Sequence, residues 1–168
     1  MADRHRVRAN ANLWLVTDAE LSVRLPTGRD DTKISFLHPD RPYKENDNDL
    51  YINDLMLDFE VHIDGPGLTV RGWTSTWGGD GLDHFFAKMD ADFRGWRGIR
   101  HWRSMEGNLT IDATHTGRHV ALDVSLSNDY YSAPWKVVIP AVVSPGEEFR
   151  QLAADVHDFV RDALSSSG

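Results

Sequence analysis

Apolar and polar side chains alternate along residues 55–63. Every second residue from Leu55 to Ile63 is apolar, and the residues between them are mostly polar. A period of two places the apolar side chains on one face of a strand. Residues 64–67 have the composition of a turn, and residues 67–77 are rich in Thr and Trp, which suit a second strand. The pattern predicts a β-hairpin over residues 55–77.

The period changes to that of a helix after a glycine-rich break at residues 77–81. Apolar side chains then recur at intervals of three and four residues, at Leu82, Phe85, Phe86, Met89 and Phe93. This spacing forms one stripe along a helix. We predict a helix over about residues 80–94, with Asp80 capping its N-terminus.

A second group of strands and a second helix follow. Residues 99–102, 108–115, 119–127 and 135–143 are predicted as strands, with Gly117 supplying a positive φ in the loop between the second and third. Pro140 cannot donate to a ladder, so the last strand is expected at a sheet edge or a bulge. Ser144 and Glu147 form a predicted capping box for a helix over about residues 145–164.

The first 54 residues are less regular. Residues 13–16, 20–25 and 33–37 are predicted as short strands and residues 38–54 as a loop. The whole order is strands, helix, strands, helix. It predicts an α+β fold with a mostly antiparallel sheet built from hairpins and two helices packed on one face. A chain of 168 residues suits a single domain, with its core in residues 55–164.

Composition narrows the classes of function. The net charge of −8 and the pI of about 5.4 argue against nucleic-acid or anionic-membrane binding and permit a basic protein partner. The chain has no cysteine, which excludes disulfides and thiolate chemistry. No apolar run is long enough for a membrane span or a signal peptide, so the expected location is the cytoplasm.

Arginine recurs every third residue at positions 94–103, with tryptophans between. One interpretation is a binding surface, with arginine charge and tryptophan stacking planes. The other is a structural seam, because the repeat crosses a helix end, a turn and a strand. In an extended strand Arg100 and Trp102 point one way, and His101 and Arg103 the other. We favour the seam, with binding on its exposed side. The candidate binding residues are Trp96, Arg97, Arg100, His101, Trp102 and Arg103.

No motif predicts catalysis or a cofactor. The chain lacks G-x-S-x-G, P-loop and H-E-x-x-H patterns. His115 and His119 flank a hairpin loop and could share a metal, but a zinc site needs further ligands. The acidic residues 45–49 lack the glycine and glutamate spacing of a calcium loop. We therefore expect no catalytic residue, metal or cofactor.

Five short segments carry a resemblance to a known family. They are Trp77, Gly79–Gly81, Asp92–Trp96, Trp102–Glu106 and Gly146–Glu147. In this pattern the chain resembles small actinobacterial proteins that form a domain family of unknown function, over roughly residues 55–164. The order of elements is also similar to that of immunity proteins paired with wall-associated contact-dependent toxins, with residues 105–109 matching their E-x-N-L strand. That likeness implies a protein that occludes a toxin and catalyses nothing.

The leading hypothesis is a non-enzymatic protein-binding module, an immunity-like inhibitor with a specific protein partner. An alternative is a small-molecule-binding protein or enzyme that uses a tryptophan-rich sheet face. The tryptophans considered for that face are Trp73, Trp77, Trp102 and Trp135. A third hypothesis is an oligomeric structural protein.

Overall fold

The computed structural model describes residues 21–29, 31–43, 55–128 and 134–165. Its first half contains β1 (Val23–Leu25), β2 (Lys33–Asp40), β3 (Met56–Gly65), β4 (Leu68–Trp77) and α1 (Leu82–Ala91). Its second half contains β5 (Ile99–Arg103), β6 (Leu109–His115), β7 (Val120–Asn128), β8 (Trp135–Val143) and α2 (Glu147–Ser165). Four strands followed by a helix therefore occur twice, which confirms the α+β class.

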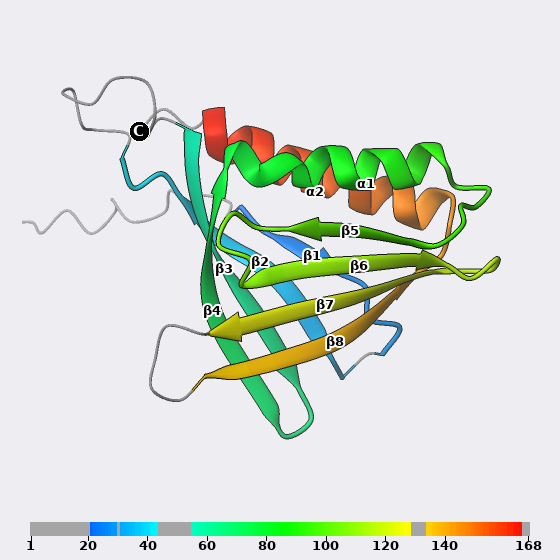
Figure 1. The fold of residues 1–168 in the computed structure, drawn as a ribbon, viewed down its shortest axis with the longest axis horizontal. Helices are drawn as coiled ribbons and strands as arrows, with labels where there is room; N and C mark the ends of the chain where they lie inside the picture. The colour runs from blue at the N-terminus through cyan, green and yellow to red at the C-terminus, as the bar shows by residue number, and fades with distance from the viewer. Residues whose placement is uncertain (1–20, 30, 44–54, 129–133, 166–168) are drawn as a thin grey trace, which may run out of the picture.

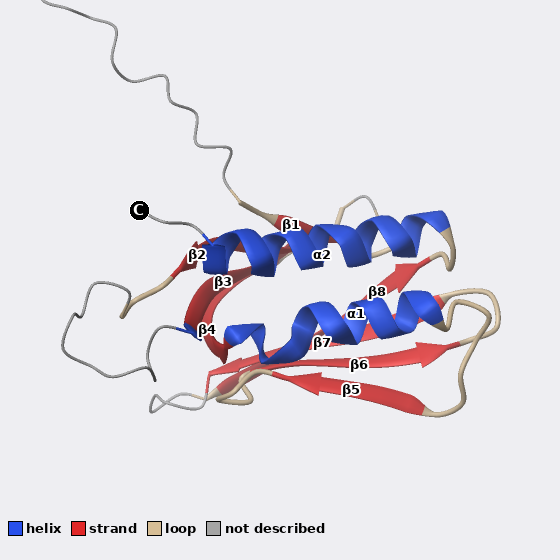
Figure 2. Ribbon diagram, turned by 90° about the horizontal axis from the view of Figure 1, so that it is seen from above, coloured by secondary structure: helices blue, strands red, loops and turns tan. Residues whose placement is uncertain are grey.

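The strands form two antiparallel sheets rather than one. The first sheet has the order β1-β2-β3-β4 and the second the order β5-β6-β7-β8. Within each sheet, strands that are consecutive in sequence pair with one another, as hairpin patterns predict. Figure 1 shows the two sheets crossing one another, with both helices along one side of them. In Figure 2, which looks down on the helices, α1 and α2 run side by side in front of the strands.

The core lies between the two sheets and under the helices. The alternation predicted for residues 55–63 is confirmed for Leu57, Phe59, Val61 and Ile63, whose side chains are all buried. It is wrong for Leu55, which precedes β3 and is 44% exposed. A cluster of aromatic rings joins the first sheet to α2, with the Phe59 ring centroid 5.5 Å from that of Phe159. The two helices meet through stacked rings of Phe86 and Phe149, 6.0 Å apart.

Side chains and backbone tie the sheets together at two corners. At one corner Thr74 Oγ1 donates to Asn108 Oδ1 (2.8 Å) and Asn108 Nδ2 donates to the Trp73 carbonyl (2.8 Å). At the other, the Val142 N–H donates to the Pro26 carbonyl (3.1 Å). Because these bonds link β4 to the β5–β6 turn and β1 to β8, each sheet fixes the position of the other.

The predicted cap of α1 is wrong. The N-cap residue is Gly81, and Asp80 Oδ1 instead accepts a hydrogen bond from the Trp77 N–H (3.1 Å). The reason is the backbone: residues 78–81 all have positive φ, with Asp80 at +49°. A run of left-handed residues turns the Asp80 carboxylate back toward β4 and away from the helix. The helix also ends at Ala91, three residues before the predicted end.

The predicted cap of α2 is displaced by one residue. The Ser144 N–H donates to Glu148 Oε2 (2.7 Å), not to Glu147, because the helix begins at Glu147. The strands predicted from residue 99 onward are confirmed, with Pro140 on the edge strand β8 and Gly117 at φ +90°. Residues 38–40 belong to β2 across a register shift. The strand predicted at 13–16 and most of the loop at 38–54 fall outside the described residues.

Candidate functional site

The arginine-rich segment joins the end of α1 to the edge strand of the second sheet. The chain leaves the helix at Ala91 and turns through Gly95 and Gly98, both with positive φ. It then enters β5, which pairs with β6 only. The strand residues alternate in exposure, which separates the side chains into an inner and an outer set.

Arg100 belongs to the inner set and fastens β5 to α1. Its Nη2 donates to Asp92 Oδ2 (2.5 Å) and its Nη1 to the Lys88 carbonyl (3.3 Å), near the C-terminus of the helix. The guanidinium also lies 4.4 Å from the centroid of the Trp96 ring. A cation at a helix C-terminus complements the exposed carbonyls there, so these contacts hold the strand to the helix.

The tryptophans of the segment are structural. Trp102 is 5% exposed, and its Nε1 donates to the Asp80 carbonyl (3.0 Å). Trp96 is half-buried beneath Arg100 and packs edge-on against His115, with 5.1 Å between ring centroids. The predicted seam between helix and sheet is therefore confirmed for both rings.

The outer set is Arg97, Ile99, His101 and Arg103, all of which are exposed. Ile99 is 70% exposed, more than any other large apolar side chain that the structure describes. His101 hydrogen-bonds Asp112 on β6 through its Nδ1. Arg97 and Arg103 form no ion pair with any of the described residues. Within the described residues, two arginines without an ion pair therefore lie on either side of an exposed isoleucine, Arg97 in the turn before β5 and Arg103 at the end of β5.

The structure thus divides the six predicted binding residues by side. Trp96, Arg100 and Trp102 serve the fold, and Arg97, His101 and Arg103 face outward. Whether the outward residues bind anything stays a prediction. Sequence reasoning missed Ile99, although the alternation that placed His101 and Arg103 together places Ile99 with them.

The proposed tryptophan-rich face contains fewer rings than expected. Trp73, 55% exposed, and Trp77 share the outer face of β4. Trp102 is buried in the second sheet. Trp135 is half-buried and lines a separate groove of about 400 Å³ with Val70 and Val137. Only two of the four tryptophans therefore lie on one accessible surface.

His115 is unsuited to metal binding. Its Nδ1 accepts from the Gly117 N–H (3.0 Å) and its Nε2 lies 3.2 Å from the Phe93 carbonyl. Both ring nitrogens are occupied, so neither has a lone pair to offer a metal ion. Among the described residues no group of three or more His, Asp or Glu side chains could hold a metal ion.

The chain is thus an α+β protein whose edge strand β5 exposes basic side chains. Residues 41–163 match a family of unknown function, DUF6228, and the chain belongs to this family. It matches no curated protein and no solved structure. The matched range contains β3 to β8 and both helices up to residue 163, and it leaves out β1 and β2. In the part of the chain that the structure describes, no helix is long and apolar enough to cross a membrane.

Proposed function

We propose that this protein is a non-enzymatic protein-binding module that works as an immunity-like inhibitor, and that it binds through the outer face of β5. The observation that carries this proposal is the exposure of Ile99 between Arg97 and Arg103, since neither arginine has an ion-pair partner among the described residues. Arginine is among the residues that carry most of the binding energy in protein interfaces, and the buried centre of an interface is more apolar than the rest of the surface.

The chemistry of β5 suggests what the partner presents. Carboxylates on the partner would pair with Arg97 and Arg103, and an apolar contact would cover Ile99. The net charge of −8 favours a partner that is basic overall, because long-range attraction depends on total charge. A basic protein with a local acidic patch satisfies both conditions. The immunity-like role is supported by the order of elements alone.

A charge-reversal experiment tests the surface. The tagged chain is used to capture partners from nuclease-treated lysate of its host, and the affinity of a stoichiometric partner is then measured by calorimetry. Arg97→Glu combined with Arg103→Glu should weaken binding at least about tenfold, because the charge pairs become repulsive. Thermal unfolding should change little, since both side chains are exposed.

Arg29→Glu combined with Arg71→Glu is the matched control. These two arginines are also exposed and also form no ion pair within the described residues, but they lie in the loop after β1 and on β4. The control should bind like the unaltered chain. Equal affinity for both double variants would contradict the proposed surface.

The alternative of a ligand-binding tryptophan face keeps a specific observation in its favour. Trp73 is exposed on β4 directly across from the carboxylate-bearing Glu60 on β3. A saturable change of tryptophan fluorescence with a metabolite, lost in Trp73→Phe and kept in Trp135→Phe, would favour this alternative over the protein-binding proposal.

A further inference from the structure

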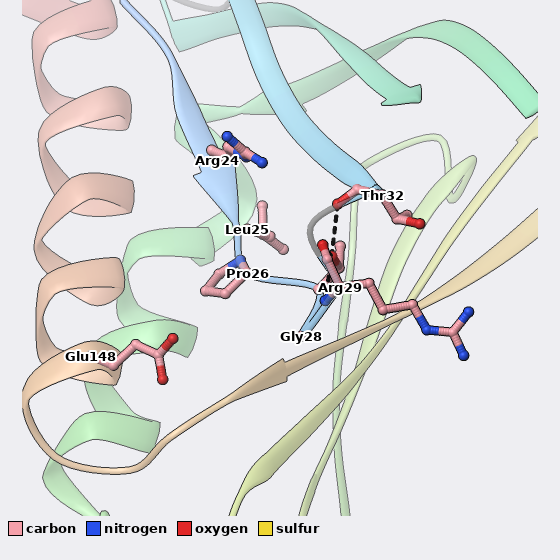
Figure 3. Close-up of a pocket in the computed structure, with 8 residues that line it drawn as sticks. Arg24, Leu25, Pro26, Gly28, Arg29, Thr32 and Glu148 are labelled. Atoms are coloured by element: carbon pink, nitrogen blue, oxygen red, sulfur yellow. Dashed lines mark hydrogen bonds between the residues drawn. The ribbon is translucent and has the colours of Figure 1, made fainter. Parts of the chain in front are cut away.

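A cleft runs between β1, the loop that follows it, and the first half of α2. It consists of two overlapping cavities of about 440 and 350 Å³ that share Arg24, Pro26 and Glu148. Figure 3 shows Arg24 on β1 and Glu148 on α2, on either side of Pro26. The floor includes Leu25 and Leu152, which are both almost fully buried.

Hydrogen bonds fasten the strand side of the cleft. The buried hydroxyl of Thr27 lies 2.9 Å from the Arg29 carbonyl and 2.7 Å from the Thr32 carbonyl, which closes the loop on itself. The Pro26 carbonyl accepts from Val142 on β8 (3.1 Å). Gly28 has a φ of +71° beside the Val142 side chain. A wall fixed in this way costs little ordering entropy when a ligand binds.

The charges across the cleft are opposite and yet do not meet. Arg24 stands on one wall, and Glu148 and Asp155 stand on the other. Arg24 forms no ion pair with any residue in the described part of the chain. Glu148 uses one carboxylate oxygen for the Ser144 N–H, and Asp155 uses one for the Gln151 amide. Among the residues that the structure describes, the second oxygen of each carboxylate has no hydrogen-bond donor.

We propose that this cleft binds a small zwitterion of dipeptide size. The ligand's carboxylate pairs with the Arg24 guanidinium, in the two-pronged geometry that arginine favours. Its ammonium group pairs with the remaining oxygen of Asp155, and its aliphatic part rests against Pro26, which lines both hollows. The two charged ends of the ligand thereby pair with opposite walls of the cleft, whose own charges do not pair with each other. This site is formed by other elements than β5, so it does not depend on the protein-binding proposal.

The cleft provides its own matched controls. Arg29 lines the same cavity, but its guanidinium extends away from the helix in Figure 3. Glu147 lines the second cavity, but its carboxylate pairs with Arg150 (3.0 Å). Arg24→Gln is therefore compared with Arg29→Gln, and Asp155→Asn with Glu147→Gln. All four replacements are exposed and keep hydrogen-bonding capacity.

The experiment is a titration of the full chain with L-alanyl-L-alanine, followed by amide chemical shifts in NMR spectra. Saturable shifts are expected at residues 25, 27 and 28 and at residues 148–155. Arg24→Gln and Asp155→Asn should each raise Kd about tenfold or more, because each removes a charge-assisted bond. Arg29→Gln and Glu147→Gln should leave Kd within about twofold.

Blocked forms of the dipeptide identify which end meets which wall. The C-terminal amide should bind about tenfold more weakly to the unaltered chain and should be insensitive to Arg24→Gln. The N-acetyl form should be insensitive to Asp155→Asn for the same reason. The proposal is overturned by the absence of saturable shifts up to about 10 mM dipeptide. Equal Kd values for Arg24→Gln and Arg29→Gln would overturn it as well.

Discussion

At the scale of single residues, two arginines that lie close together in the sequence have different roles. Arg97 and Arg100 are three residues apart, and the turn at Gly98 lies between them. Arg100 contacts Asp92, the Lys88 carbonyl and the Trp96 ring, whereas Arg97 extends from the surface without an ion pair among the described residues. Their substitutions should therefore have different consequences for stability.

Arg100→Gln is expected to lower the free energy of unfolding by about 1–2 kcal/mol. The change removes a partly buried ion pair and a cation–π contact, and each contributes roughly 0.5–1.5 kcal/mol. Arg97→Gln should change the unfolding free energy by less than about 0.5 kcal/mol. Urea denaturation of the two variants measures this difference. Similar losses for both would mean that Arg97 also supports the fold.

The sequence predicted which way the side chains of the candidate site point, but not how exposed they are. Period-two alternation was enough to place Arg100 and Trp102 on one side of β5 and His101 and Arg103 on the other. The pairing of Arg100 with Asp92 depends on how α1 lies above the strand. The exposure of Ile99 depends on β5 being an edge strand with an uncovered outer face. Local sequence does not encode that property.

At the scale of elements, the left-handed turn at residues 78–81 connects β4 to α1 and also contacts α2. A Cβ on Gly79 would lie 2.8 Å from Val160 Cγ1, whereas a Cβ on Gly78 would meet no atom within 4 Å. Both glycines have positive φ, at +79° and +56°. Gly79 is thus required both by its backbone conformation and by the close approach of α2, and Gly78 only by its conformation.

Gly79→Ala is expected to cost about 2–4 kcal/mol of unfolding free energy, and Gly78→Ala about 1–2 kcal/mol. The shared part is the left-handed strain on alanine, and the excess at Gly79 comes from overpacking against Val160. Adding Val160→Ala should recover part of the excess in Gly79→Ala, measured as coupling in a double-mutant cycle. A coupling energy of zero would show that residues 79 and 160 are not overpacked against each other.

The elements that the sequence predicted well are those whose signal is local. Residues 55–77 and 108–127 alternate cleanly, and both hairpins are present. The helix caps were predicted wrongly because Asp80 and Glu147 were judged by residue type, without the positive φ of the residues around them. The division into two sheets was missed because alternation shows which face of a strand is buried. It does not show that β4 and β5 pair with different partners.

At the scale of the whole molecule, the family match and the folded unit cover different ranges of residues. The match begins at residue 41 and so leaves out β1 and β2. These strands nevertheless contribute Val23, Leu25, Ile34 and Phe36 to the core, all nearly fully buried. The Phe36 ring lies 5.3 Å from Phe59 and 6.4 Å from Phe159, which connects β2 to both β3 and α2. The first sheet and α2 therefore share their core with residues outside the family range.

A fragment of residues 41–165 is therefore expected not to fold cooperatively, whereas a fragment of residues 21–165 should do so. Losing four buried apolar side chains costs about 6–12 kcal/mol at 1.5–3 kcal/mol each. That loss is comparable to the entire stability of a domain, about 5–15 kcal/mol. Thermal unfolding followed by circular dichroism, with dispersion of amide resonances as a second measure, compares the fragments. A sharp transition in residues 41–165 would mean that β3 is a sufficient edge for the first sheet and that β1 and β2 only cover it.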